Sequence, residues 1–216
     1  MKTLKIKPQR NYPTLKNVQN RLKKNKKIGL FGGTFDPVHA GHLIIAETMC
    51  EQAGLDVIIF IPSARPPHKH HELMFDAGQR FNMLSDAIKG NTNFLISDIE
   101  MKREGPSYTI DTIREIKAGL PVETELAFIV GRDNLYDLEM WKTPYDIIKE
   151  CTILVADRIC DQRRDIPDWL KPKVQIVKVP LIEISSSEIR QRIRDGKSIR
   201  YMVPDVVIQE VKNLKL

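Results

Sequence analysis

Two histidines that follow a glycine-rich turn are the first residues whose types and spacing could do chemistry. Residues 31–42 have the sequence FGGTFDPVHAGH. A short apolar run ends at Gly32 and Gly33, which let the backbone turn and approach a ligand closely. A helix is predicted to begin just after His39, so His39 and His42, three residues apart, lie on one side of its first turn. Two imidazoles beside a helix N-terminus favour an anion, and phosphate is the natural guest.

Each part of this pattern also has an ordinary explanation. A Gly-Gly turn after a strand is common, and a single histidine near a helix start is more often a surface residue or a cap. Two histidines also suggest zinc, but the metalloprotease arrangement spaces them four apart with a glutamate beside the first. Here the spacing is three and no glutamate lies between His39 and His42. We therefore predict no metal site in the protein itself.

A second polar segment lies near the end of the chain. Residues 184–190 have the sequence ISSSEIR. Ser185 and Glu188 fit a capping box, in which a serine side chain and a glutamate three residues later satisfy the first N–H groups of a helix. Arg190 and Arg194 are four apart and share one face of that helix. Taken alone, this pattern predicts a well-capped surface helix.

Found in this order, about 145 residues apart, the two segments resemble the (T/H)xGH and ISSTxIR signatures of the nucleotidylyltransferase superfamily. The class I aminoacyl-tRNA synthetases carry a signature related to the first. The most similar family is bacterial nicotinate-nucleotide adenylyltransferase, over roughly residues 28–213. Further matches to that family are RPPHK at residues 65–69, REGPSYTIDT at residues 103–112, Gly131-Arg132-Asp133 where the family has GxD, and Trp141 eight residues beyond Asp133.

The resemblance implies transfer of the adenylyl group of ATP to nicotinate mononucleotide, giving deamido-NAD and pyrophosphate in cytoplasmic NAD biosynthesis. It also implies Mg²⁺ as a cofactor that accompanies ATP and is held mainly by phosphate and water. Nicotinamide mononucleotide or another phosphorylated acceptor remains an alternative. Phosphopantetheine as acceptor is disfavoured, because Tyr108-Thr109 and Trp141 suit a pyridine ring. An alternative of another class is a nucleic-acid-binding regulator that uses a basic arm.

Roles for the nucleotide-binding residues follow from the same resemblance. His39, His42 and Arg190 are the expected catalytic residues, with His42 stabilising the transition state. Ser186 and Ser187 are expected to donate hydrogen bonds to the β- and γ-phosphates of ATP, and Arg190 to hold them with its planar, permanent charge. The residues expected to bind ATP are Gly32, Gly33, Thr34, Phe35, His39, His42, Asp133, Ile184, Ser186, Ser187 and Arg190.

The acceptor is expected to lie against a second set of residues. Trp141 offers a stacking face for a flat ring. Tyr108 and Thr109 open a helix whose N–H groups suit a carboxylate, and the amide after Trp141 is expected to do the same. Arg132 departs from the family, where a small or apolar residue is usual, and its side chain is expected to reach a phosphate or to point into solvent. The residues expected to bind the acceptor are Thr34, Lys69, Tyr108, Thr109, Trp141 and Lys142.

Apolar runs that alternate with helical patterns must position these residues. Such runs are typical of strands buried on both faces, so the chain is predicted to be α/β, a Rossmann-like doubly wound parallel sheet in three α/β/α layers. Ligands of such sheets bind outside the carboxyl ends of the strands. Strands are predicted at 28–31, 57–61, 94–97, 126–130, 153–156 and 174–179, and helices at 41–52, 78–89, 109–117, 186–194 and 204–213.

The charge distribution divides the 216 residues into a basic arm, 1–27, predicted to be mobile, and a nucleotidylyltransferase domain, 28–216. The arm holds ten of the 34 Lys and Arg residues and no Asp or Glu, so the domain carries 24 basic against 28 acidic residues. That balance argues against a nucleic-acid partner. Three cysteines and no apolar run of about 18 residues indicate a cytoplasmic protein without a membrane partner. The sequence leaves a homo-oligomer open.

Overall fold

The central element of the protein is a parallel sheet. A computed structural model describes residues 22, 26–66, 73–158 and 165–213, and in these residues six strands pair in the order β3-β2-β1-β4-β5-β6. The predicted fold class is confirmed. The chain leaves β1 first toward β2 and later toward β4, so the strand order reverses between β1 and β4. The strands are β1 (Lys27–Gly33), β2 (Val57–Pro62), β3 (Phe94–Ile96), β4 (Glu125–Gly131), β5 (Thr152–Arg158) and β6 (Val174–Val179).

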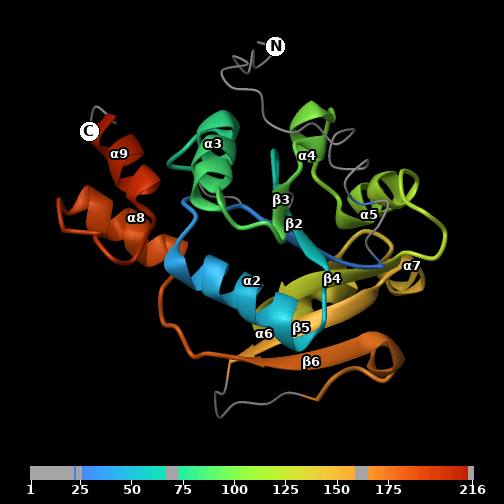
Figure 1. Cartoon of the computed structure of the whole chain (residues 1–216). Coiled ribbons are helices and arrows are strands. Elements are labelled where there is room, and N and C mark those ends of the chain that lie inside the picture. Colours follow the sequence, from blue (N-terminus) through green and yellow to red (C-terminus); the bar gives the residue numbers. More distant parts are fainter. Residues whose placement is uncertain (1–21, 23–25, 67–72, 159–164, 214–216) are drawn as a thin grey trace.

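Helices cover both faces of the sheet and give three layers (Figure 1). No helix in the described part of the chain is long and apolar enough to cross a membrane. One buried cluster joins the sheet to α2 (Ala40–Gln52), α3 (Ala77–Ala87), α8 (Ser186–Arg194) and α9 (Asp205–Asn213). The other joins it to α4 (Ile99–Lys102), α5 (Thr109–Lys117), α6 (Arg132–Asp137), the 3₁₀ turn Leu138–Met140 and α7 (Pro144–Glu150).

The strands are continuously apolar because both of their faces are buried. In β2, Ile58 and Phe60 belong to the first cluster, while Val57, Ile59 and Ile61 belong to the second. All five side chains are at most 3% exposed. Successive residues of a strand point to opposite faces, so an alternating polar residue here would lie in one of the two cores. This is the physical reason why the apolar runs predicted a sheet covered on both sides.

The predicted helices begin within about two residues of their observed starts, and two local signals explain the caps. Asp76 precedes α3, accepts from the backbone N–H of Gln79 at 2.8 Å, and its own N–H donates to the Gln79 side chain. Ser185 precedes α8 and accepts from the backbone N–H of Glu188 at 3.1 Å. Ser185 therefore supplies its half of the predicted capping box. The shorter helices α4, α6 and α7 were not predicted.

The start of the sheet differs slightly from the predicted boundary at residue 28. β1 begins at Lys27, and the backbone N–H groups of Lys26 and Lys27 donate to the Asp56 carboxylate at 2.7 and 3.0 Å. Leu22, assigned to the arm, is fully buried in the second cluster. Residues 1–21 and 23–25, which make up most of the predicted arm, lie outside the described residues, so its mobility and its boundary stay predictions.

Candidate functional site

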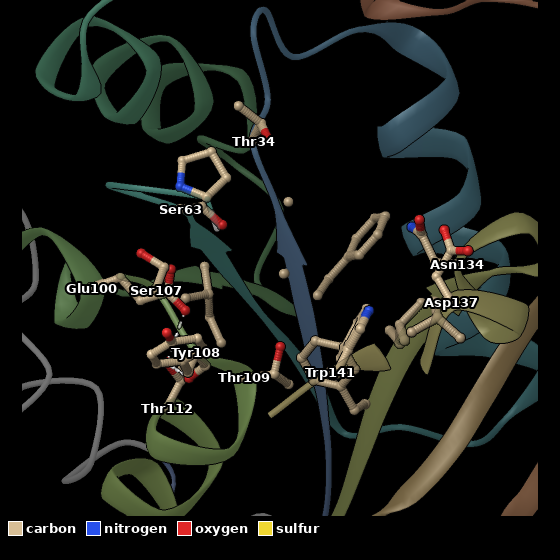
Figure 2. Close-up of a pocket in the computed structure, with 18 of the residues that line it drawn as sticks. Thr34, Ser63, Glu100, Ser107, Tyr108, Thr109, Thr112, Asn134, Asp137 and Trp141 are labelled. Atoms are coloured by element: carbon tan, nitrogen blue, oxygen red, sulfur yellow. Dashed lines mark hydrogen bonds between the residues drawn. The ribbon is translucent and has the colours of Figure 1, made fainter. Parts of the chain in front are cut away.

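A pocket of about 500 Å³ lies at the carboxyl ends of β1, β2 and β4, where the strand order reverses. Ligands of open α/β sheets bind at this kind of position. We call it the Trp141 pocket (Figure 2). It is lined by Phe31, Gly32, Gly33, Thr34, Ile61, Ser63, Pro66, Glu100, Ser107, Tyr108, Thr109, Thr112, Phe128, Ile129, Val130, Gly131, Asn134, Asp137, Met140 and Trp141.

The loop between β1 and α2 turns tightly around the ring of Phe35. Phe35 is 2% exposed and has a positive φ of 50°. A Cβ atom on Gly33 would lie 2.9 Å from the Phe35 ring, closer than real contacts allow, so this position requires glycine unless the ring moves. Gly32, Gly33 and Thr34 line the Trp141 pocket, as expected for residues that meet a ligand through the backbone.

His39 and His42 stack on each other at the start of α2. Their ring centroids are 3.6 Å apart with 26° between the planes, and His39 is 4% exposed. The backbone N–H of His39 donates to Nδ1 of His42 at 3.3 Å. Because Nδ1 is the acceptor, the neutral His42 ring carries its proton on Nε2. The two predicted histidines therefore form one unit, held in place by the backbone of the helix they begin.

The second signature packs directly onto this loop. Nη1 of Arg190 donates to the backbone oxygen of Asp36 at 2.8 Å, and the guanidinium lies 3.7 Å from the Asp36 carboxylate. Nη2 donates to Oγ of Ser187 at 3.1 Å, and the Ser186 hydroxyl donates to the Pro37 oxygen at 3.0 Å. Segments about 150 residues apart thus meet at one place. We call Asp36, His39, His42, Ser186 and Arg190 the histidine–arginine cluster.

Two buried charged residues that the sequence did not reveal hold the loops around the cluster. Asp36 is 1% exposed and accepts from the backbone N–H groups of Met74 and Phe75, at 3.1 and 3.0 Å. Arg80 is fully buried, and its Nη1 donates to the backbone oxygens of Thr34, at 2.6 Å, and Ser63, at 2.8 Å. Burial lowers the pKa of Arg80, and the charge of Asp36 opposes that shift. Arg80 therefore joins the loops that follow β1 and β2.

The N-terminal end of α5 faces the Trp141 pocket. Tyr108 is its N-cap residue, and both Tyr108 and Thr109 line the cavity, as predicted. The first N–H groups of a helix have no partner within the helix, so this end presents donors and a positive dipole end to the pocket. Figure 2 shows Tyr108 and Thr109 on one side of the pocket and Asn134 and Asp137 on the other.

Trp141 also lines the pocket, where its ring packs edge-on against Phe128 with the centroids 6.0 Å apart. One face of the indole is thereby fixed relative to β4. Lys142, also predicted to contact the acceptor, directs its side chain elsewhere. Its Nζ lies 2.9 Å from the Asp111 carboxylate and 4.5 Å from the centre of the Tyr108 ring. The Lys142 side chain therefore lies against Asp111 and the Tyr108 ring, and a role for its backbone amide stays a prediction.

Arg132 corrects the sequence-based expectation. Nη1 of Arg132 lies 2.7 Å from the Asp157 carboxylate, and Nε donates to the Tyr136 hydroxyl at 3.3 Å. The side chains of the pair are 13% and 9% exposed. The prediction that Arg132 reaches a phosphate or solvent is wrong, because Asp157 at the carboxyl end of β5 binds the guanidinium. Asp133, the adjacent residue, is exposed in the first turn of α6.

Ile184 and Lys69 are the remaining predicted site residues. Ile184 is partly buried and packs against the first core cluster, just before the α8 N-cap. Lys69 lies outside the described residues. Among those that are described, no group of three or more His, Cys, Asp or Glu side chains could hold a metal ion.

Glu100 is a further pocket residue that the sequence did not reveal. It is 7% exposed and lines the Trp141 pocket from α4. Oε1 accepts from Oγ1 of Thr112 at 2.8 Å, and Nη1 of Arg103 donates to the same Thr112 oxygen at 3.0 Å. Burial raises the pKa of the Glu100 carboxyl, while hydrogen bonds from Thr112 and Ser107 oppose the shift. A helix of four residues has too short a pattern to be recognised by periodicity.

Comparison with known proteins agrees with this geometry. A cytidylyltransferase-like family model matches residues 30–192. Two relatives are named "Probable nicotinate-nucleotide adenylyltransferase". The one from Dehalococcoides mccartyi is 40% identical, and the match covers 86% of this chain and 94% of the relative. The one from Exiguobacterium sibiricum is 43% identical, and the match covers 88% of this chain and 98% of the relative. The fold matches Plasmodium falciparum nicotinic acid mononucleotide adenylyltransferase complexed with NaAD, with a TM-score of 0.73, 21% identity, and coverage of 87% of this chain and 96% of that one. The chain therefore belongs to the nicotinate-nucleotide adenylyltransferases of the cytidylyltransferase-like family.

Proposed function

We propose that this protein transfers the adenylyl group of ATP to nicotinate mononucleotide, giving deamido-NAD and pyrophosphate. The observation that carries the proposal is the arrangement at the sheet end. A cluster suited to phosphates and a pocket suited to a flat anionic ring meet at the loop after β1. The names of relatives that are about 40% identical to this chain support the same activity.

The triphosphate of ATP is proposed to lie on the histidine–arginine cluster. His39 and His42 meet the α- and β-phosphates, since their stacked rings lie at the start of α2, beside its positive end. Arg190 holds the leaving pyrophosphate with the N–H groups not engaged by Asp36 and Ser187. Ser186 and Ser187 offer the first N–H groups of α8 to the same phosphates.

The rest of ATP is proposed to contact residues on either side of the cluster. Gly32, Gly33, Thr34 and Phe35 form the loop whose backbone the phosphates approach. Asp133, exposed at the start of α6, accepts hydrogen bonds from a ribose, and Ile184 contacts the nucleoside beside α8. The pair Arg132–Asp157 closes the sheet end between β4 and β5, so these two side chains shape the nucleoside side of the site without reaching the phosphates.

The acceptor is proposed to fill the Trp141 pocket. The pyridine ring stacks on Trp141, and its carboxylate faces the N–H groups of the first turn of α5, which begins at Thr109. Thr34 borders both regions and therefore lies beside the acceptor phosphate. The backbone amide of Lys142 and the side chain of Lys69 complete the predicted acceptor set.

The chemical step needs positioning more than proton transfer. The 5′-phosphate of nicotinate mononucleotide is already an anion at neutral pH, so its oxygen attacks the α-phosphorus of ATP without a strong general base. A new P–O bond forms as the bond between the α-phosphorus and the bridging oxygen breaks, and pyrophosphate leaves with the electron pair. His42 and Arg190 stabilise the charge that grows on the phosphates, and fixed donors do this at little reorganisation cost.

Magnesium is proposed to enter as part of MgATP. The donor set fits this role, because the cluster offers imidazole, guanidinium and hydroxyl groups to phosphates, and its single carboxylate, Asp36, is buried and already occupied. When bound, the ion would neutralise phosphate charge. His39, His42 and Arg190 orient the same phosphates from the protein side. The cytoplasmic location and the homo-oligomer stay predictions.

Nicotinamide mononucleotide is the close alternative acceptor. It has the same ring and phosphate but an uncharged amide, so it fits the stacking face of Trp141 equally well. The α5 N-terminus, together with the backbone amide of Lys142, distinguishes the two acceptors, since a helix N-terminus favours an anion. A nucleic-acid-binding regulator is the alternative of a different class, and it depends on the arm, most of which lies outside the described residues.

The activity is tested by identifying the products. Purified protein is incubated with ATP, MgCl₂ and nicotinate mononucleotide, and both products are quantified by mass spectrometry and a pyrophosphate assay. We expect deamido-NAD and pyrophosphate in equal amounts, with turnover retained after deletion of residues 1–27. Pyrophosphate without dinucleotide would show ATP hydrolysis instead. No product with either pyridine mononucleotide would reject the proposed activity.

A further inference from the structure

Glu100 is a buried carboxyl in the wall of the Trp141 pocket that has no role in the chemistry described above. It lines the Trp141 pocket and is 7% exposed. Oε1 accepts a hydrogen bond from Oγ1 of Thr112, with 2.8 Å between the two oxygens. Oε2 is buried without a hydrogen bond of good geometry from any described residue. A carboxyl this deeply buried costs free energy unless its oxygens are engaged. Its presence in the pocket wall therefore calls for a function.

Three segments of the pocket wall converge on this carboxyl. Thr112 lies one turn into α5, Ser107 lies in the loop before α5, and Ser63 follows β2, and all three line the pocket. The hydroxyls of Ser107 and Ser63 are near enough to lower the pKa of Glu100, as is the charge of Arg103. Figure 2 shows Glu100, Ser107 and Thr112 together on one side of the cavity.

The donor directions within this group are consistent. Ser107 Oγ accepts from the backbone N–H of Arg65 at 3.2 Å, so its own hydroxyl proton is available to Glu100. Thr112 Oγ1 accepts from Nη1 of Arg103 at 3.0 Å and gives its proton to Glu100. Nη2 of Arg103 then reaches Glu115 at 2.6 Å, two turns along α5. The carboxyl thus joins α4, the loop after β2 and the start of α5.

We propose that Glu100 is a positioning residue for the acceptor: it fixes the N-terminal end of α5 in the pocket wall and so sets how tightly the pyridine carboxylate is held. This inference rests on the proposed function and deepens it. Glu100 acts through the start of α5, where Tyr108 and Thr109 line the cavity. The neighbours that Glu100 engages lie on α5 and in the loops after β2 and before α5, outside the histidine–arginine cluster, so its removal should spare the ATP side.

The test compares the KM for the acceptor with the KM for ATP in three variants. Glu100→Ala removes the acceptor oxygens, Glu100→Gln keeps the shape and one oxygen for Thr112, and Glu104→Gln removes an exposed carboxylate four residues away as a matched control. We expect Glu100→Ala to raise the acceptor KM about tenfold, the order of magnitude for leaving a buried hydrogen-bonding group without its partner. The ATP KM should change less than about threefold, and both Gln variants should stay close to wild type.

Each other outcome overturns the inference. Equal rises in both KM values would show general damage, and an unchanged acceptor KM would show that Glu100 does not act on the acceptor. A selective rise that Glu100→Gln fails to rescue would make charge, not position, the cause. If Glu100→Ala does not fold, Thr112→Val replaces it, with the same expected split. Absence of wild-type turnover with nicotinate mononucleotide would reject the proposed function and this inference together.

Discussion

The histidine–arginine cluster and the Trp141 pocket meet at the loop after β1, yet they are built in different ways. The cluster comes from two short segments, 36–42 and 186–190, which contact each other directly through Asp36 and Pro37. The pocket takes its walls from the ends of β1, β2 and β4 and from α4, α5 and α6. Its shape depends on long-range contacts such as Arg80 with Thr34 and Ser63.

This difference assigns separate tasks to the two regions. In the cluster, cations and helix N-termini are fixed before a ligand binds, which is what stabilising a growing phosphate charge requires. In the pocket, an aromatic face and a helix end are the groups that we propose to select one flat ring over another. Changes in the cluster should therefore act mainly on turnover and ATP, and changes in the pocket mainly on the acceptor.

The largest effect is expected from His42→Ala. Its ring stacks on His39 and is oriented by the His39 backbone, so no neighbouring group replaces it. We expect kcat to fall about 10²- to 10³-fold, as for loss of one preorganised charge-stabilising group, with the acceptor KM nearly unchanged. Pyrophosphate release measures both. Glu51→Ala, on an exposed part of the same helix, is the control. A change in the acceptor KM alone, with kcat unchanged, would contradict the separate tasks of the cluster and the pocket.

Arg190→Lys should have the next largest effect. A lysine keeps the charge but cannot reach the Asp36 backbone oxygen and Ser187 together while presenting further donors to phosphate. We expect kcat/KM for ATP to fall about 10²-fold. The matched control is Arg194→Lys, one turn further along α8 and exposed. Steady-state kinetics with varied ATP measures this change. Equal kcat/KM values for the two variants would contradict a role of Arg190 in holding ATP.

Trp141→Ala tests the pocket in the same way. Loss of the stacking face should raise the acceptor KM about tenfold, because aromatic pairs contribute about 0.5–1.5 kcal/mol beyond the area they bury. The ATP KM should not follow. Trp141→Phe keeps a ring against Phe128 and should recover most of the affinity. Saturation curves for each substrate at fixed excess of the other distinguish the outcomes, and a rise in both KM values would contradict the division of tasks.

The smallest effect concerns the stability of the pocket wall and its dependence on pH. Burial is the main cause that raises the pKa of Glu100 above its ordinary value of 4.5. Below pH 4.5 the carboxyl is protonated whether the chain is folded or not, and the stability it contributes there is lost as pH rises through the folded pKa. Thermal melting of Glu100→Gln and wild type should therefore agree near pH 4. The variant should gain about 2–4 °C at pH 7 to 8.

A matched control makes that comparison decisive. Glu104 is exposed, so Glu104→Gln should leave the melting temperature within about 1 °C of wild type at every pH. If Glu100→Gln shows the same difference from wild type at pH 4 and pH 8, then Glu100 does not titrate with a raised pKa. The pocket wall would then hold a fully ionised carboxylate, and hydrogen bonds from Thr112, Ser107 and Ser63 would offset the free-energy cost of burying its charge.

The sequence predicted the parts of this molecule that depend on local pattern. Continuous apolar runs identified the strands, and the short spacing of His39 and His42 placed the two imidazoles together at a helix start. Ser185 and Glu188 located the start of α8, although the pattern alone predicted only a surface helix. The resemblance to a family then joined two segments that no spacing rule connects.

The remaining features depend on contacts between distant segments. Helices α4 and α6 have four and six residues, too few for a periodic pattern, and Leu135 and Ile99 fix them by packing into the core. Arg80 and Glu100 act through partners from 12 to 46 residues away. The ion pair of Arg132 was missed because its partner Asp157 is 25 residues away in the sequence. No local signal could have found these interactions.

The most direct test of the account is the ratio of kcat/KM for nicotinate mononucleotide to that for nicotinamide mononucleotide, measured with saturating MgATP. The two acceptors differ only at the group that we place against the α5 N-terminus. An anion in a favourable site at a helix end gains up to about 2 kcal/mol, which corresponds to about 30-fold. We predict a preference for the acid of at least about this size. Equal use of both acceptors would contradict the assignment of the Trp141 pocket while leaving adenylyl transfer on the histidine–arginine cluster intact.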